Sequence, residues 1–334
     1  MELGLAIAFA LAFTLTNGFH DASNAIATLV ATRGAGPGQA IALSAVFNLL
    51  GALVFGTAVA GTIAGIVSVG DAALVAVTGS GLLAATLWNL VTWWRGLPSS
   101  SGHALVGGLV GAALAQAGTG AVNWGGLDGW SPVGVLGVLI ALALSPLIGL
   151  AFGFVLSRSG RRLLRRATRR TRKPIRSSEW AMSAALSFSH GANDAQKGMG
   201  AIAALLVATG HLSSFSVPLW AKLTCGLALT LGTALGGWRI VRTVGRRIFR
   251  LTPIDGFASQ SASTAVILGS SFLGAPVSTT QVVASSVVGV GGGRRRWRHV
   301  RWAVVRSISA AWLLTLPCTL ALGAVTLAIW DAIG

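Results

Sequence analysis

The sequence has no tyrosine, only two cysteines and only eight acidic residues among 334. Charged residues of both signs make up 10% of the chain, whereas an ordinary soluble domain carries about 25%. This shortage argues against a soluble globular protein, because most of the chain lacks the charged side chains that a water-facing surface needs. The two cysteines, Cys225 and Cys318, lie in apolar segments, so no disulfide framework is predicted.

Apolar sequence is abundant instead. Hydrophobic residues make up 53% of the chain, and the mean hydropathy is +0.74. Several apolar stretches reach the roughly 20 residues that a helix needs to cross a bilayer, and helices satisfy their backbone hydrogen bonds without water. In place of tyrosine the chain has tryptophans, most of which flank these stretches, as anchors at a membrane surface do. The composition predicts an all-α polytopic membrane protein.

The net charge of +17 is concentrated in three short hydrophilic segments. They hold 20 of the 25 lysines and arginines, with ten in 158–176, five in 239–250 and five in 294–301. Cytoplasmic loops of membrane proteins carry such an excess of positive charge. We therefore predict a multi-pass protein of the plasma membrane, embedded in the lipid bilayer with these loops in the cytoplasm. The same placement argues against binding to nucleic acid.

Two polar motifs each occur twice. One pair is Gly18-Phe-His-Asp-Ala-Ser-Asn-Ala25 and Gly191-Ala-Asn-Asp-Ala-Gln-Lys197, and the other is Pro98-Ser-Ser-Ser-Gly-His103 and Pro276-Val-Ser-Thr-Thr-Gln281. Asp21 precedes Ser99 by 78 residues, and Asp194 precedes Ser278 by 84. The same motifs in the same order at similar spacing indicate an internal repeat. We predict transmembrane repeats at 1–157 and 178–334, joined by a basic cytoplasmic linker at 158–177.

The basic loops also give the direction of each repeat. If all three loops are cytoplasmic, each half fits about five crossings. Because five is an odd number, the two repeats then have inverted topology, and both termini lie outside. The segments 97–117 and 276–292 are short and rich in glycine, so each fits either a crossing or a broken or re-entrant helical hairpin. Secondary transporters use inverted repeats with the binding site between them.

Asp21 and Asp194 each lie inside an apolar segment, where an isolated carboxylate is costly and normally marks an ion or substrate path. The alternative is that both motifs are short interfacial loops. That alternative does not explain why amides recur beside the carboxylates. Carboxylate and amide oxygens are good ligands for hard cations. The predicted cation-binding residues are Asp21, Asn24, Asn193 and Asp194, and the two aspartates are metal ligands if the coupling ion is sodium.

The hydroxyl-rich motifs follow a proline and precede a helix-compatible stretch, so each reads as a helix start. A helix N-terminus offers unpaired N–H groups and the positive end of a dipole, which suits an oxyanion. Ordinary N-caps are the alternative for either motif alone, but two inverted copies favour binding. The predicted anion-binding residues are Ser99, Ser100, Ser101, Ser278, Thr279, Thr280 and Gln281.

Other polar residues in the motifs have two interpretations each. His20, His103 and His190 are candidates for contacts with protons or the anion, or for hydrogen-bonded packing. Lys197 either lies near the anion or extends from the span towards an interface. An anion beside two aspartates needs cations or protons between them, so co-binding of both ions is the basis of symport. The sequence predicts no cofactor and no enzyme: an intramembrane metal hydrolase would want a clustered spacing such as H-E-x-x-H, which the chain lacks.

At these motifs the chain resembles the inorganic phosphate transporter (PiT) family, in particular its bacterial low-affinity symporters. The resemblance rests on Asn17-Gly-Phe-His-Asp-Ala-Ser-Asn-Ala-Ile-Ala-Thr28, Ser189-His-Gly-Ala-Asn-Asp-Ala-Gln-Lys-Gly-Met-Gly200 and the two hydroxyl-rich motifs, and it extends over nearly the whole chain. It implies inverted repeats, a homodimer, and symport of phosphate with sodium or protons, with protons slightly favoured. Sulfate or another oxyanion, and a metal–phosphate complex, remain alternatives for the cargo.

Overall fold

The computed structural model describes residues 1–163, 172–235, 248–294 and 297–333. The first half forms α1 (Glu2–Ala31), α2 (Pro37–Val54), α3 (Ala58–Ala64), α4 (Asp71–Arg95), α5 (Ser101–Ala117) and α6 (Gly134–Leu163). The second half forms α7 (Arg172–Ala208), α8 (Leu219–Leu235), α10 (Pro253–Phe272), α11 (Thr279–Gly293) and α12 (Trp302–Ile333). Between α5 and α6 lie a 3₁₀ turn and a small antiparallel hairpin of β1 (Gly126–Asp128) and β2 (Ser131–Val133), which the sequence did not predict.

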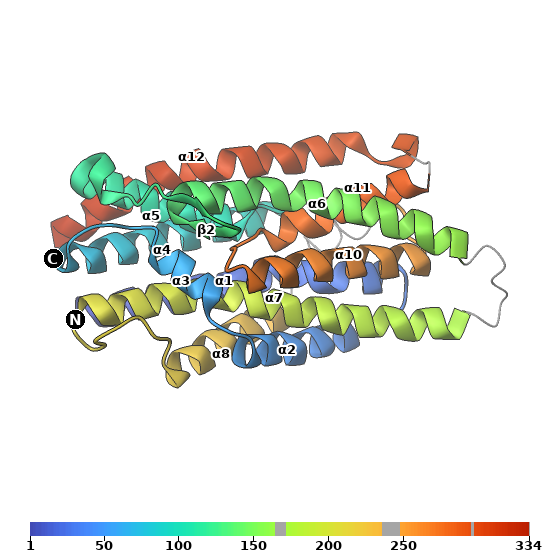
Figure 1. Ribbon diagram of the computed structural model, residues 1–334, viewed down its shortest axis with the longest axis horizontal. Coiled ribbons are helices and arrows are strands. Elements are labelled where there is room, and N and C mark those ends of the chain that lie inside the picture. The colour runs from blue at the N-terminus through green and yellow to red at the C-terminus, as the bar shows by residue number, and fades with distance from the viewer. Residues whose placement is uncertain (164–171, 236–247, 295–296, 334) are drawn as a thin grey trace.

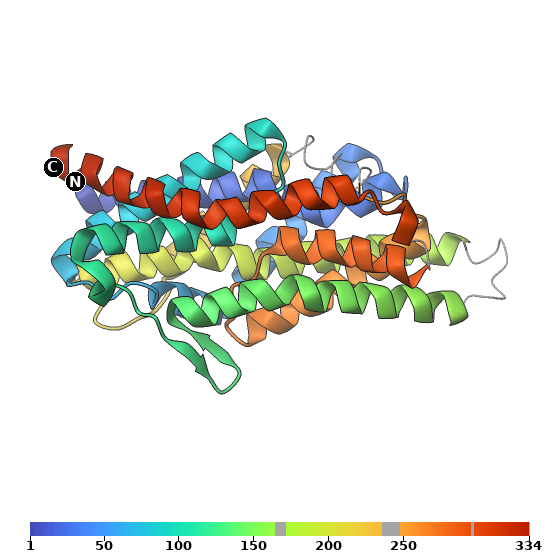
Figure 2. The same cartoon turned by 90° about the horizontal axis from the view of Figure 1, so that it is seen from above.

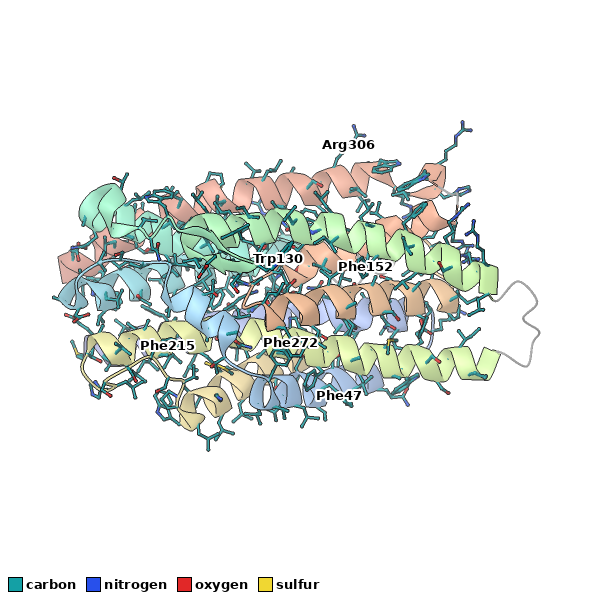
Figure 3. All side chains as sticks on the ribbon, in the orientation of Figure 1. Phe47, Trp130, Phe152, Phe215, Phe272 and Arg306 are labelled. Carbon is teal, nitrogen blue, oxygen red and sulfur yellow. The ribbon has the colours of Figure 1, made fainter. Side chains whose placement is uncertain are left out.

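The prediction of an all-α polytopic membrane protein is confirmed. Among the described residues, six helices are long and apolar enough to cross a bilayer. Large apolar side chains cover the outside of the bundle, among them Phe152 and Phe272, which are both exposed (Figure 3). Water would penalise such a surface, whereas lipid matches it.

Corresponding helices of the two halves run in opposite directions. Both termini lie at one end of the molecule (Figures 1 and 2). α1 leads away from that end, whereas its counterpart α7 leads towards it. α5 likewise leads to the end that holds the termini, and α11 leads to the opposite end. These directions are those that an inverted repeat requires.

α4 with α5, and α10 with α11, form two helical hairpins that enter the bundle from opposite ends and turn back inside it. The segments 97–117 and 276–292 thus each include the turn of a helical hairpin and its returning helix, and α4 and α5 of the first hairpin are both long and apolar enough to cross a bilayer. Each turn contains a glycine in the left-handed region, Gly96 (φ 67°) and Gly274 (φ 68°), where other residues are strained. Close packing also needs glycine: a Cβ on Gly108 of α5 would lie 2.3 Å from the carbonyl oxygen of Gly81 in α4.

Helix boundaries differ from the prediction in two places. The apolar stretch 40–69, one of those long enough to cross a bilayer, is not one continuous helix, because α2 ends at Val54 and α3 covers only Ala58–Ala64. The expected basic linker at 158–177 is largely helical where it is described, because α6 continues to Leu163 and α7 begins at Arg172. The remainder of that linker, 164–171, lies outside the described residues, as do most of the basic segment 239–250 and residues 295–296 of the third one.

Candidate functional site

The N-termini of α5 and α11 point into the same central region. α5 begins after Ser100, whose Oγ accepts a hydrogen bond from the backbone N–H of His103 (3.2 Å). α11 begins in the same way after Ser278, whose Oγ accepts from the backbone N–H of Gln281 (3.4 Å). Both predicted serines are thus helix caps. Because the two helices run apart from the centre (Figure 2), the positive ends of both dipoles lie there, and such a place favours an anion.

Asp21 of α1 connects the two helix N-termini. Its Oδ2 accepts hydrogen bonds from Ser101 Oγ of α5 (3.0 Å) and from Thr279 Oγ1 of α11 (3.4 Å). Its Oδ1 accepts from Thr280 Oγ1 (2.5 Å) and from Asn24 Nδ2 (3.1 Å). One buried carboxylate therefore collects three hydroxyl donors from both halves of the chain. The structure brings together predicted anion ligands and predicted cation ligands at one point.

His20 and Asn193 precede the aspartate in the two motifs, and each holds the hairpin of its own half. His20 Nε2 lies 3.2 Å from the hydroxyl of Ser99, in the turn between α4 and α5. Asn193 Nδ2 donates to the carbonyl of Ala275 (3.2 Å), and its Oδ1 accepts from the backbone N–H of Val277 (3.3 Å). The Asn193 amide is thus engaged with the turn between α10 and α11.

Asp194 of α7 has different partners from Asp21. Its Oδ1 accepts hydrogen bonds from Lys197 Nζ and from Asn17 Nδ2 (3.4 Å), and its Oδ2 lies 3.3 Å from His190 Nε2. Lys197 Nζ also donates to the carbonyl of Val277 (3.2 Å). Lys197 is fully buried, so the interpretation that it extends to an interface is wrong. A buried ammonium group needs a counter-charge, and Asp194 supplies it.

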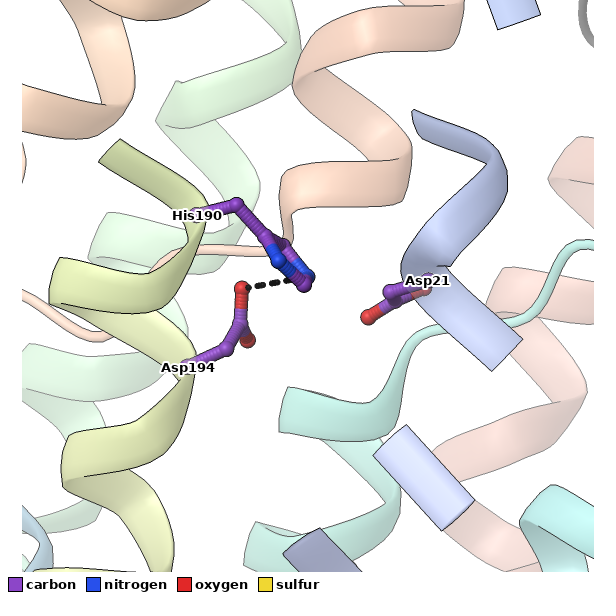
Figure 4. A group of neighbouring side chains, drawn as sticks. All are labelled: Asp21, His190 and Asp194. Atoms are coloured by element: carbon purple, nitrogen blue, oxygen red, sulfur yellow. Dashed lines mark ion pairs between the residues drawn. The ribbon is translucent and has the colours of Figure 1, made fainter. Parts of the chain in front are cut away.

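Asp21, His190 and Asp194 form a cluster that could hold a cation (Figure 4). One ligand atom from each of the three lies within 4.8 Å of the others. Asn48 Oδ1 lies 3.0 Å from His190 Nδ1, which fixes the ring with Nε2 towards Asp194. Sequence reasoning did not place His190 between the carboxylates. The available signal was the four-residue spacing of His190 and Asp194, which puts both on one helix face.

Two further predicted residues, His103 and Gln281, lie beside this centre, as does Asn17, which the sequence did not predict as a site residue. His103 Nδ1 lies 2.7 Å from Ser100 Oγ. Gln281 Oε1 and Asn17 Oδ1 are buried without a hydrogen-bond partner among the described residues. Buried polar atoms normally have a partner, so these two oxygens suit contacts with a bound ligand.

The centre is closed in this conformation. Asp21 and Thr280 are 1% exposed, Ser101 is 2% exposed, and Asp194 is fully buried. A site with both carboxylates and anion-directed helix ends, enclosed midway between two oppositely directed hairpins, has the arrangement found in secondary transporters. The fold and the site therefore define a multi-pass membrane transporter of that architectural class.

Comparisons with known proteins agree with this class. A model of the phosphate transporter family matches residues 17–323. A probable low-affinity inorganic phosphate transporter of Bacillus subtilis is 39% identical, covering 98% of this chain and 97% of that protein. One of Mycobacterium tuberculosis (strain H37Rv) is 43% identical over 99% of this chain and 78% of its own length. A solved structure described as the sodium-dependent phosphate transporter has a TM-score of 0.85 and 26% identity, with full coverage of both chains. The chain belongs to the phosphate transporter family, as the resemblance predicted.

Proposed function

We propose that this protein imports inorganic phosphate across the plasma membrane by symport with a cation, a proton or sodium, through alternating access. One observation carries the proposal. Hydroxyl groups at the N-termini of two oppositely directed helices, those of Ser101, Thr279 and Thr280, meet at the buried carboxylate of Asp21. Membership of the phosphate transporter family and the names of its relatives support phosphate as the cargo.

Competition for hydroxyl hydrogens explains how the two ions are coupled. Each hydroxyl has one hydrogen to donate, and in this conformation the hydroxyls of Ser101, Thr279 and Thr280 all donate to Asp21. Phosphate at the helix ends needs the same donors, and it is repelled by the carboxylate. A cation at Asp21 neutralises that charge and leaves the hydroxyl hydrogens free to turn towards phosphate. Each ion therefore strengthens the binding of the other, and this reciprocity is the thermodynamic basis of symport.

The carboxylates favour phosphate over sulfate. Phosphate retains at least one proton at neutral pH, so it can donate a hydrogen bond to Asp21 or Asp194. Sulfate is fully ionised and can only accept hydrogen bonds, so it would leave a buried carboxylate facing a like charge without a donor between them. An oxyanion site lined by hydroxyls alone would not make this distinction. Sulfate or another oxyanion remains the second candidate for the cargo.

Two other classes of membrane protein, an intramembrane hydrolase and a passive channel, are less well supported than a transporter. The match to the phosphate transporter family and the names of its relatives support transport over a hydrolase. A passive channel would carry phosphate only to equilibrium, without dependence on a cation gradient, so uptake measurements distinguish it from symport. We therefore assign no catalytic reaction. Rocking of the two halves would open the centre to one side at a time.

The setting of the transporter in the membrane is also a proposal. We place the basic segments in the cytoplasm and both termini outside, because short cytoplasmic loops carry excess positive charge. The three basic segments, 158–176, 239–250 and 294–301, hold 20 of the 25 lysines and arginines. We further propose that two copies assemble as a homodimer, in keeping with the family resemblance.

Uptake of radiolabelled phosphate into proteoliposomes tests the proposal. The vesicles would carry either an inward proton gradient or an inward sodium gradient, with and without excess unlabelled sulfate. We expect accumulation above equilibrium that follows one of the gradients and resists sulfate. Phosphate that never exceeds equilibrium would exclude symport, and strong suppression by sulfate would transfer the assignment to another oxyanion.

A further inference from the structure

The two halves place different residues three positions after their aspartate. Asn24 follows Asp21 in the first half, and Lys197 follows Asp194 in the second. Asn24 Nδ2 donates to Asp21 Oδ1 (3.1 Å), and Lys197 Nζ donates to Asp194 Oδ1. The two side chains thus have the same place in the motif and the same contact with their own aspartate. One of them is neutral, and the other carries a positive charge.

The helix that faces each of these side chains differs in a matching way. Counted from the N-cap of each helix, Gly102 of α5 corresponds to Thr280 of α11. Asn24 Nδ2 donates to Thr280 Oγ1 (3.0 Å). In the other half, a Cβ added to Gly102 would lie 3.7 Å from Lys197 Nζ. The longer lysine side chain therefore ends beside the position that a threonine side chain would fill, so Lys197 with Gly102 is the counterpart of Asn24 with Thr280.

Lys197 changes the charge of the centre. With histidine counted as neutral, Asp21, Asp194 and Lys197 sum to one negative charge, and all three are buried. Among the described residues, no other lysine, arginine, aspartate or glutamate forms an ion pair with them. One monovalent cation neutralises this sum. A second cation would lie close to the Lys197 ammonium group in a poorly screened interior, where like charges repel strongly.

We propose that Lys197 is a fixed counter-charge that replaces one coupling cation, so that the site binds one transported cation per cycle, between Asp21 and Asp194. The cluster with His190 is the place for that cation, since its ligand atoms converge there. A site with asparagine in both halves would hold two buried carboxylates without a fixed counter-charge and would need two cations. The inference rests on the proposed function, because it concerns the ratio of cation to phosphate.

A double variant rebuilds the first-half arrangement in the second half. Lys197→Asn with Gly102→Thr gives Asp194 the neutral pair that Asp21 already has. The charge moved per phosphate is read from the reversal potential of uptake in proteoliposomes, at fixed pH and fixed sodium gradient. We expect it to rise by one elementary charge relative to the unmodified protein. Lys222→Asn is the matched control, because it removes a lysine of α8 outside the site, and it should leave the ratio unchanged.

An unchanged ratio in an actively transporting double variant would overturn the inference. Should the double variant fail to insert or transport, the unmodified protein provides the deciding measurement, the flux of labelled sodium or of protons per phosphate. One cation per phosphate supports the inference, and two or more overturn it. If the unmodified protein does not accumulate phosphate at all, the proposed function fails and the inference fails with it. Phosphate accumulation with the wrong ratio refutes the inference alone.

Discussion

The hydroxyl of Thr280 lies between the proposed phosphate site and the proposed cation site. It donates to Asp21 Oδ1 (2.5 Å) and accepts from Asn24 Nδ2 (3.0 Å). We expect Thr280→Val, which keeps the shape and removes the hydroxyl, to raise the KM for phosphate about tenfold to a hundredfold, the usual effect of losing a hydrogen bond to a charged group. Thr280→Ser keeps the donor and should stay within a few-fold of the unmodified protein. Equal KM values for the valine and serine variants would show that the hydroxyl does not contact phosphate.

In the proposed mechanism, Asp21 provides the negative charge that attracts the coupling cation. In Asp21→Asn the side chain is neutral, so a cation loses its attraction to the centre, and the amide introduces new donors among the hydroxyls. We expect gradient-driven phosphate uptake to fall by at least about a hundredfold, while the amount of protein in the membrane stays the same. Asp71→Asn is the control, because Asp71 is exposed at the start of α4. Normal coupled uptake by Asp21→Asn would exclude Asp21 as the cation site.

The packing of α4 against α5 determines the position of the turn between them. Glycines at the contact allow the two backbones to approach closely. A Cβ on Gly108 would meet the backbone of Gly81 at 2.3 Å, and backbone atoms cannot turn aside. We expect Gly108→Ala to separate α4 from α5 and to lower the thermal midpoint in detergent by several degrees, together with uptake. Gly269→Ala is the matched control in the other hairpin, because a Cβ there meets nothing within 4 Å and alanine favours a helix. A stable, active Gly108→Ala variant would mean that the hairpin tolerates this separation.

Glu179 is a titratable group near the start of α7, at the end of the molecule beside the basic linker. It lies in the second turn of α7, fully buried, and its Oε1 accepts a hydrogen bond from Thr32 Oγ1 (2.5 Å) at the end of α1. Burial raises the pKa of its carboxyl from 4.5 to about 7, although the Thr32 hydrogen bond and the charge of Arg176 oppose the shift. The folded state therefore holds the proton more tightly than the unfolded chain does.

The sign of the pH dependence follows from that raised pKa. Stability from the protonated Glu179 carboxyl is complete at low pH and is lost as the pH rises from about 4.5 to about 7. Glu179→Gln cannot ionise, so its thermal midpoint should fall by about 2–4 °C less than that of the unmodified protein between pH 5 and pH 8. Thermal unfolding in detergent measures this, with the exposed Glu2→Gln as control. Parallel pH curves for Glu179→Gln and the unmodified protein would contradict the prediction.

The sequence predicts which segments form helices better than it predicts how far each helix extends through the bundle. Apolar length identifies the long helices α1, α6 and α12, because length and hydropathy are local properties. It cannot decide whether α5 and α11 cross or turn back, since both alternatives have the same composition. That choice depends on packing partners far along the chain, such as the contact of α5 with α12 and of α11 with α6.

At the scale of the whole molecule, the site also combines residues that the sequence predicts with contacts that only the fold brings together. The two motifs and their repetition predict Asp21 and Asp194 as site residues from the sequence alone. Their partners come from distant segments, such as Thr280, 259 residues from Asp21, so no local pattern could pair them. Lys197 shows the limit most clearly. Its sequence surroundings allow an interfacial or a central position equally, and only the packed bundle places its ammonium group beside Asp194.

The proposed orientation of the molecule in the membrane can be tested at its two ends. The end beside the basic linker holds Ser177, and the opposite end holds Ser214, between α7 and α8; both residues are exposed. In a background with Cys225 and Cys318 replaced by serine, we expect Ser214→Cys to react with a membrane-impermeant maleimide on intact cells. Ser177→Cys should react only after permeabilisation, because we place the basic segments in the cytoplasm by their excess of positive charge. The reverse pattern would show the opposite orientation and would contradict the cytoplasmic placement of the basic segments. Labelling of both sites on intact cells would show that α7 does not cross the bilayer.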